Sequence, residues 1–219
     1  MSVKSAHDRL VIAIDGTFAS GKGTLGKALA QHYDLPYLDT GKLYRAVALS
    51  VMIRGGEVEH EASCVKAATH LDINTLDDPK LKSGPVGAAA SKVAVHQGVR
   101  TALLDLQRNF AKNGAVMDGR DIGTVICPNA DVKLYIDAGQ EERARRRHAE
   151  LIGYGEDINY DTVLAQLKER DTRDMNRTEA PLKPAEDAHL LDTTNLSIER
   201  AFDASVALID AVLGGRPGL

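Results

Sequence analysis

Short apolar runs alternate along the chain with longer segments in which apolar residues recur every three or four positions. The first run, 10–14, is continuously apolar and is followed by an Asp-Gly pair, which is typical of a strand buried on both faces of a parallel sheet. Leu25, Ala28 and Leu29 then repeat at helical spacing before a second short run at 37–38. This order predicts a strand, a helix and a second strand at the start of the chain.

Three further apolar runs predict strands at 115–117, 132–136 and 189–191. Each of these runs is followed by an aspartate and then by helix-like sequence. Strands that alternate with helices in this way predict an α/β fold, in which a five-stranded parallel sheet is flanked by helices.

Three other segments have the apolar spacing of amphipathic helices. Their expected inward faces are Leu43, Val47 and Val51 before the pair Gly55-Gly56, then Val99, Leu103, Leu106 and Phe110 before Asn113-Gly114, and finally Ile198, Phe202, Val206 and Ile209. We expect the tail 214–219 after the last helix to be frayed. The stretch 57–90 has two turn signals with a proline and few apolar residues between them, so we expect a small, partly irregular appendage there.

Composition excludes several classes of protein. Hydrophobic residues make up 43% and charged residues 26% of the 219, as in ordinary globular chains. No apolar run approaches the roughly 20 residues of a membrane helix, and the first ten residues do not resemble a signal peptide, so we expect a cytoplasmic protein without a membrane partner. Cys64 and Cys127 have neither metal-ligand spacing nor a CxxC pattern, which argues against a zinc site or a disulfide framework.

The net charge of -4 argues against a nucleic-acid polymer as the main partner, and the six Tyr, three Phe and no Trp offer few stacking rings for one. The positive charge is uneven, however, because the 35 residues 143–177 contain seven Arg and one Lys. These features together favour a small anionic ligand.

A glycine-rich segment follows the first predicted strand and opens the first predicted helix, and it fits the phosphate-binding pattern GxxxxGK with Gly and Thr after the Lys. Backbone N–H groups of such a loop surround phosphate oxygens at a helix N-terminus. We expect Lys22 to have an exposed ammonium group that bridges the β and γ phosphates of ATP, and Thr24 to reach Mg²⁺. A plain glycine-rich turn is the alternative. The candidate ATP-binding residues are Gly16, Thr17, Phe18, Ala19, Ser20, Gly21, Lys22, Gly23 and Thr24.

A phosphate-binding loop alone is compatible with a GTPase, a motor or a small-molecule kinase, and the absence of an NKxD motif argues against the GTPase. Four further segments accompany the loop: Asp39-Thr40-Gly41, Tyr44-Arg45, 118–121 (DGRD) and 170–177 (RDTRDMNR). With them, the chain closely resembles the cytidylate kinase (CMP kinase) family of the bacterial type, which belongs to the P-loop nucleoside monophosphate kinases. The resemblance runs from Val11 to the last helix.

The resemblance implies roles for residues on the acceptor side. Thr40, Arg45 and Arg120 match positions that hold the acceptor nucleotide and its phosphate, whereas Ser91, Arg100 and Asp121 match the set that reads cytosine. Asp118 ends the strand beside the phosphate-loop strand, where such proteins place an acid for Mg²⁺ or its water. From the residues alone, a helix cap at Asp39-Thr40 and a turn cap at Asp118 both stay open.

The arginine cluster divides into two parts. The resemblance places Arg146 and Arg147 at the donor side of a lid, Arg170 on phosphate, Asp174 on ribose and Arg177 near the base. A solvated helix face is the open alternative for Arg143 and Arg145, and the second part could be neutralised by Asp171 and Asp174 as surface ion pairs.

The family resemblance implies one domain over 1–219, with a core at 10–56 and 99–213, an acceptor-binding lobe at about 57–98 and an Arg-rich lid at about 147–170. The stretch 57–90 is too short for the three-stranded insert of well-known members, so we expect a reduced, partly helical lobe. Thr17 and Phe18 replace the usual Pro-Ser or Pro-Ala, and we expect no side-chain chemistry from either.

The implied reaction is transfer of the γ-phosphoryl group of ATP to CMP or dCMP with Mg²⁺, by a monomer, with Lys22, Arg120, Arg147 and Arg170 as catalytic residues. The acceptor phosphate is largely deprotonated at neutral pH and needs no general base. A kinase for another acceptor, such as UMP or shikimate, is the first alternative and would need other residues at Arg100 and Asp121. A nucleotide-binding regulatory protein is the second.

Overall fold

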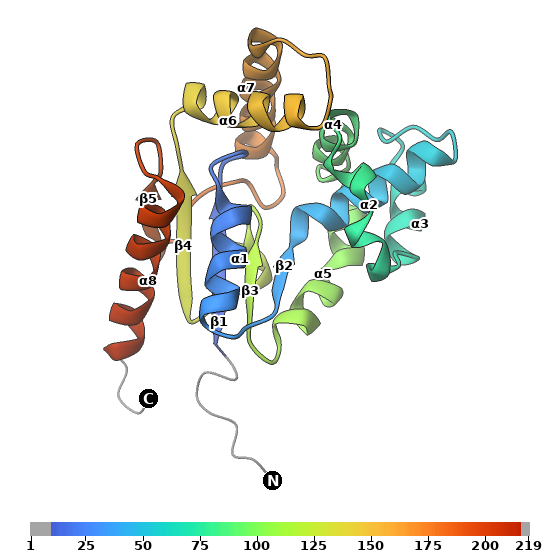
Figure 1. Ribbon diagram of the computed structural model, residues 1–219. Coiled ribbons are helices and arrows are strands. Elements are labelled where there is room, and N and C mark those ends of the chain that lie inside the picture. Colours follow the sequence, from blue (N-terminus) through green and yellow to red (C-terminus); the bar gives the residue numbers. More distant parts are fainter. Residues whose placement is uncertain (1–9, 216–219) are drawn as a thin grey trace.

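The computed structural model describes residues 10–215, and these form a five-stranded sheet in the order β2-β3-β1-β4-β5 (Figure 1). All neighbouring strands run parallel. The strands are β1 (Val11–Gly16), β2 (Tyr37–Asp39), β3 (Ala115–Asp118), β4 (Val132–Asp137) and β5 (His189–Asp192). The predicted parallel sheet is confirmed, and β2 to β5 each end on the aspartate that follows the apolar run.

Helices connect the strands and cover both faces of the sheet. They are α1 (Lys22–His32), α2 (Thr40–Ile53), α3 (Glu61–Thr69), α4 (Gly84–Val93), α5 (Gln97–Ala111), α6 (Gln140–Gly153), α7 (Tyr160–Asn176) and α8 (Ile198–Gly214). Short helical turns lie at η2 (Ile73–Asp77), η3 (Pro79–Lys82) and η4 (Ile122–Ile126).

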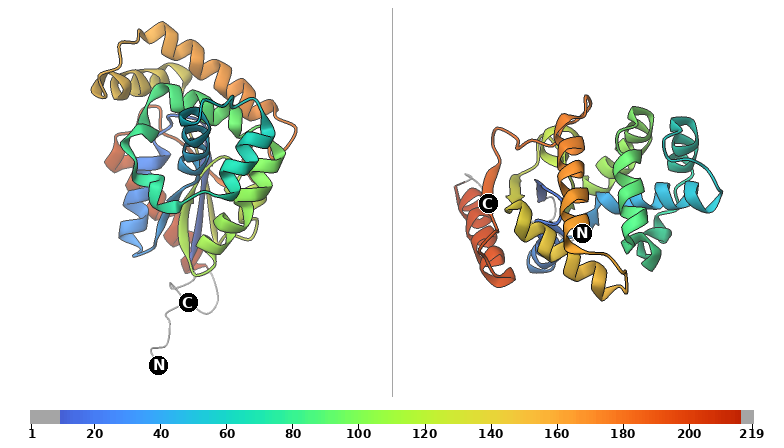
Figure 2. Two further views of the ribbon diagram at one scale, coloured as in Figure 1. Left: turned by 90° about the vertical axis from the view of Figure 1, so that its right-hand side faces the viewer. Right: turned by 90° about the horizontal axis from the view of Figure 1, so that it is seen from above.

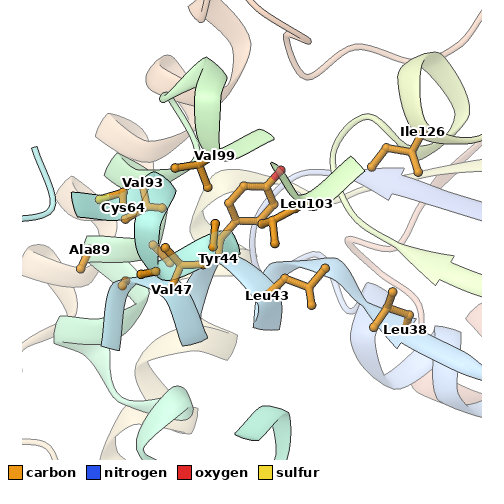
Figure 3. Packing of buried hydrophobic residues seen from close by; sticks show 14 of the residues in the cluster. Leu38, Leu43, Tyr44, Val47, Cys64, Ala89, Val93, Val99, Leu103 and Ile126 are labelled. Atoms are coloured by element: carbon orange, nitrogen blue, oxygen red, sulfur yellow. The ribbon is translucent and has the colours of Figure 1, made fainter. Parts of the chain in front are cut away.

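Alternation along the strands divides the core into two layers. Ile12 and Ile14 of β1 pack with α1 and α8 on one face of the sheet, whereas Ala13 between them packs with α2 and α5 on the other. The second layer continues into the helices of the lobe, and Figure 3 shows Tyr44 of α2 near Leu103 of α5 within it. The apolar core therefore joins the sheet to the segment that contains α3 and α4.

That segment is more helical than we expected. Between α2 and α5 the structure contains α3, η2, η3 and α4, and this described stretch holds no strand. The expected partly helical and partly irregular character agrees with α3, α4 and the short turns η2 and η3, but the sequence pattern did not locate these helices because their buried positions are small. Cys64, Ala67, Ala68 and Ala90 are each at most 5% exposed, and such residues make a weak hydrophobic pattern.

The expected inward face of the last helix is wrong at its first position. Ile198 is 62% exposed, whereas Ile209 is fully buried and Phe202 and Val206 pack partly against the same core. Ile198 opens α8 just beyond the carboxyl end of β5, so sheet side chains do not cover it. Most of the tail that we expected to be frayed, residues 216–219, lies outside the described range. Nine of the first ten residues, which we compared with a signal peptide, also lie outside it. Within 10–215, no helix has both the length and the apolar character that a membrane span requires.

Helices α6 and α7 lie across the carboxyl edge of the sheet, between α8 and the helical lobe (Figures 1 and 2). At its far end this pair contacts the lobe. The Glu156 carboxylate accepts a hydrogen bond of 2.6 Å from the backbone N–H of Gly84 at the start of α4, and the Lys82 amine lies 5.8 Å from the centre of the Tyr154 ring. Helices α6 and α7 therefore cover the carboxyl edge of the sheet.

Candidate active site

A cleft of about 620 Å³ lies at the carboxyl edge of the sheet, and the glycine-rich loop forms one end of it. The loop needs glycine at two positions. Gly16 has φ +144°, and a Cβ there would lie 1.8 Å from the carbonyl oxygen of Ile136; Gly21 has φ +96° and caps α1. Strand, loop and helix thus follow each other as phosphate binding requires, with the positive helix end directed at the cleft.

Lys22 lies inside the loop, which corrects our expectation of an exposed ammonium group. Its side chain lines the cleft but the residue is only 4% exposed, and its amine donates a 2.6 Å hydrogen bond to the Thr17 carbonyl. Burial, together with the nearby charge of Arg120, lowers the pKa of Lys22. The motif could not show this arrangement because the loop closes around its own side chain.

Asp118 and Thr40 are joined at the ends of β3 and β2. The Thr40 hydroxyl donates to the Asp118 backbone carbonyl at 2.8 Å, and the Tyr37 hydroxyl donates to the Asp118 carboxylate at 3.1 Å. Asp39 occupies the cap position of α2 without a side-chain capping bond, so the simple helix-cap interpretation is wrong. Burial raises the pKa of Asp118 to about 6, although Lys22 opposes the shift.

The opposite end of the cleft holds a buried carboxylate between two guanidinium groups. Asp121 forms an ion pair with Arg100, and its other oxygen lies 3.9 Å from Arg177. Arg177 Nη2 is buried and has no hydrogen-bond partner among the described residues. Arg100 also donates a hydrogen bond of 3.5 Å to the hydroxyl of Tyr44. This end can therefore pair with a polar group that offers both a donor and acceptors.

Between the two ends, two arginines share the carboxylate of Asp174. The Nε of Arg120 donates to Asp174 at 3.1 Å, and the Nε of Arg170 lies 3.7 Å from the same oxygen. Burial lowers the pKa of Arg170 to about 9, against the attraction of Asp174. Arg45 of α2 donates to the carbonyl of Leu81 in the lobe at 2.6 Å. The middle of the cleft thus collects guanidinium groups with little negative charge between them.

Arg143 near the start of α6 links this helix to the phosphate-binding loop and to α7. Arg143 is 2% exposed, forms a buried ion pair of 2.7 Å with Asp171 of α7, and donates to the Phe18 carbonyl at 3.1 Å. A solvated face is therefore wrong for Arg143, but it holds for Arg145, whose side chain is 69% exposed. Arg147 lies near the cleft and pairs with Glu150 at 2.6 Å.

Arg146 joins the loop to the end of β5. It donates to the Thr193 carbonyl at 2.6 Å, and the Thr193 hydroxyl in turn donates to the Ser20 carbonyl at 2.9 Å. Sequence reasoning missed this end of the cleft. The missed lining residues after β5 are Thr193, Leu196, Ser197, Ile198 and Ala201. Their signal was the position of 193–198 directly after a parallel strand, where ligands of α/β sheets bind.

Two predictions about individual side chains need correction or addition. Thr17 donates to Asp137 at 2.6 Å, and the Phe18 ring lies beneath two guanidinium groups, so both side chains make contacts that the sequence did not indicate, while the expectation that neither supplies side-chain chemistry stays a prediction. Ser91 lines the cleft as expected, but its hydroxyl accepts a 2.8 Å bond from Arg173. The expected residues therefore meet in one cleft, with the exception of the more enclosed Gly16 and Thr17, which do not line it.

Asp15 was also missed. It is buried at the end of β1, and its two carboxylate oxygens accept bonds of 2.7 Å each from the backbone N–H groups of Ile122 and Gly123. Burial raises the pKa of Asp15 to about 7 in spite of these bonds. Asp15 therefore fastens the segment after Asp121 to the strand that leads into the loop.

Comparison with known proteins gives a consistent result. The family model described as cytidylate kinase matches residues 12–211. A protein named cytidylate kinase from Xanthobacter autotrophicus is 56% identical over 94% of this chain and all of its own length. Its namesake from Brucella suis biovar 1 is 51% identical over 95% of this chain and 96% of its own. Among solved structures, an uncharacterized protein from Eubacterium ventriosum has a TM-score of 0.53 at 17% identity, covers 93% of this chain and 99% of its own, and shares the fold.

Proposed function

The chain belongs to the cytidylate kinase family, and from this premise we propose that it transfers the γ-phosphoryl group of ATP to CMP or dCMP, giving ADP and CDP or dCDP. The observation that carries the proposal is the single cleft with two unlike ends. A phosphate-binding loop forms one end, a buried Asp-Arg pair forms the other, and arginines lie between them.

The donor nucleotide binds at the loop end. Residues 16–24 surround the phosphates of ATP, and Lys22 exchanges the Thr17 carbonyl for phosphate oxygens when they arrive. Arg146 lies at the same end, where it links Ser20 to Thr193. These contacts fit a base and a triphosphate that lie along the ends of β1 and β5.

The acceptor nucleotide binds at the lobe end. Thr40, Arg45 and Arg120 hold its phosphate, and Asp174 lies where it can contact the ribose. Arg100, Asp121, Arg177 and Ser91 read the base. Cytosine has an N4 amino group that donates to a carboxylate, whereas uracil has the acceptor O4 at the same place. This set of residues therefore favours CMP over UMP. Shikimate has no base for such a set to read.

The fit of Mg²⁺ rests on hard oxygen donors that line the cleft beside the loop. Thr24 and Asp118 both line it, and a Cβ at Gly23 would lie only 3.7 Å from the Asp118 carboxylate. One hydroxyl and one carboxylate suit an ion that keeps several waters and binds phosphate. Mg²⁺ supplies charge neutralisation of the phosphates when bound.

The chain's own residues supply position and positive charge. The acceptor phosphate of CMP has a second pKa near 6, so its attacking oxygen needs no general base. Arg120, Arg147 and Arg170 stabilise the charge on the transferring group, a role that is worth roughly 10³ to 10⁵ in rate for an arginine. The segment at about 147–170 acts as the lid that excludes water, and 57–98 acts as the acceptor lobe, within one monomeric cytoplasmic domain.

A coupled assay of ADP release tests this function directly. With ATP and Mg²⁺, we expect turnover with CMP to exceed turnover with UMP or shikimate by at least 100-fold, and dCMP to be accepted. ADP release that does not depend on any acceptor would contradict the transferase proposal and favour a nucleotide-binding regulator. Equal turnover with CMP and UMP would contradict the assignment of the base-reading set.

A further inference from the structure

The aromatic ring of Phe18 lies beneath the two arginines that come from different helices of the lid. The guanidinium carbon of Arg170 in α7 is 4.0 Å from the ring centre, and that of Arg147 in α6 is 5.5 Å from it. Both distances lie within the roughly 6 Å at which a cation is attracted to an aromatic face. A residue of the phosphate-binding loop thus contacts both lid helices through its side chain.

The electrostatics of Arg170 explain why this contact matters. Arg170 lies near the charges of Arg45, Arg120 and Arg147, which together with burial disfavour its protonated form. Its nearest carboxylate, Asp174, is already hydrogen-bonded to Arg120. The Nε of Arg170 is buried and has no hydrogen-bond partner within 10–215. Beside Asp174 at 3.7 Å, the Phe18 face is therefore a second local source of attraction for this guanidinium group.

An aromatic face differs from a carboxylate as a partner for arginine. A carboxylate occupies N–H donors and cancels the charge, whereas a ring stacked on the guanidinium plane leaves the N–H groups at its edge free and the charge intact. Free donors and an uncancelled charge are what the transferring phosphoryl group requires. The remaining recorded bond of Arg170 is weak, 3.4 Å to the Gly87 carbonyl.

We propose that Phe18 is a positioning residue whose ring holds Arg170, and with it Arg147, over the phosphate-binding loop with their donors directed at the transferring phosphoryl group. This inference rests on the proposed function and adds to it a side-chain role within the loop. Phe18 itself touches no reacting atom and acts through the two arginines.

The test compares Phe18→Leu, which keeps apolar volume but has no aromatic face, with Phe18→Tyr, which keeps the face. With ATP and CMP, we expect Phe18→Leu to lower kcat by about 5- to 30-fold and to change the KM values of both substrates less than threefold. We expect Phe18→Tyr to stay within about twofold of the wild type. Phe202→Leu is the matched control, because Phe202 belongs to α8, packs against the core and does not line the cleft. It should leave kcat within twofold of the wild type.

A variant at position 170 shows whether the effect of Phe18→Leu on kcat depends on the contact with Arg170 or on a general change in the loop. Glutamine carries no charge and is not attracted to the ring as a cation is, so in Arg170→Gln, where only the contact with Arg147 is left, the further change Phe18→Leu should lower kcat by a clearly smaller factor than in the wild type. An equal effect in both backgrounds would overturn the proposal, as would equal activity of Phe18→Leu and Phe18→Tyr. If Phe18→Leu lowers the melting temperature by more than a few degrees, Phe18→Met replaces it under the same criteria. A wild-type protein that does not phosphorylate CMP would instead contradict the proposed function itself.

Discussion

Within the phosphate-binding loop, Lys22 is the residue whose substitution we expect to lower phosphoryl transfer most. Its amine is buried against the Thr17 carbonyl, and the same carbonyl also accepts from the Ser20 hydroxyl at 3.0 Å. Lys22→Ala therefore leaves the carbonyl paired, and we expect the melting temperature to change by only a few degrees. We expect kcat to fall by about 10² to 10³, since a charge that faces the phosphates is lost.

Turnover and thermal melting of Lys22→Ala are measured on one preparation. Near wild-type turnover would contradict the assignment of the loop to phosphate binding. A loss of more than about 10 °C would show that the buried amine is mainly structural.

We propose that Asp121 decides which base is accepted. Asp121→Asn keeps the shape of the side chain, but its amide can donate as well as accept, so it can pair with uracil. We expect kcat/KM for CMP to fall and the preference for CMP over UMP to narrow by at least tenfold. Asp105→Asn, an exposed change on α5 outside the cleft, serves as the control. Equal proportional losses with CMP and UMP would move the base-reading role to other residues.

Asp15 gives the stability of the fold a pH dependence with a definite sign. Its pKa is about 7 in the folded protein and near 3.8 in the unfolded chain, so the unfolded state releases this proton first as the pH rises. The contribution of Asp15 to stability is therefore present at low pH and is lost between about pH 4 and 7. We expect the melting temperature of the wild type minus that of Asp15→Asn to shrink by several degrees from pH 5 to pH 8. A difference that grows over this range has the wrong sign for the prediction.

Elements were predicted well where their residues are large and periodic. The strand runs and the loop follow from the sequence pattern, whereas the position of Asp118 beside β1 was implied by the family resemblance. The sequence indicated a partly helical lobe but did not place its helices, because alanines such as Ala67 and Ala90 give little periodic contrast. The burial of Arg143 was missed because its partner Asp171 lies 28 residues away, on another helix.

The pair of α6 and α7 depends on that ion pair. Removing one partner leaves a buried charge uncompensated, which costs about 3–5 kcal/mol in comparable cases. We therefore expect Asp171→Ala to lower the melting temperature by about 6 to 20 °C, at roughly 2–4 °C per kcal/mol for a chain of this size. Asp161→Ala, an exposed change in the first turn of α7, is the matched control. A shift as small as that of the control would show that Arg143 finds other partners.

At the scale of the whole molecule, the charge of the cleft opposes that of the chain. The net charge is -4, yet the cleft is lined by one lysine and seven arginines against four aspartates and two glutamates. Small anions are therefore attracted locally, whereas long polyanions meet a repelling surface. The composition indicated this contrast through the cluster at 143–177, the family resemblance added Arg45, Arg100 and Arg120, and the fold brings both groups into one cleft.

The contact between Glu156 and Gly84 has a consequence for how often the enzyme can turn over. If the segment at about 147–170 acts as the proposed lid, a bond that keeps it on the lobe during transfer must break before CDP and ADP can leave. We therefore expect this one hydrogen bond to favour the chemical step and to delay the release of products. Glu156→Gln should weaken this bond, whereas Asp157→Asn beside it should not. If departure limits the cycle, we expect the Gln variant to raise kcat by up to about threefold while the KM for CMP rises; if transfer limits it, kcat falls instead. Steady-state kinetics of the two variants therefore shows which step sets the pace.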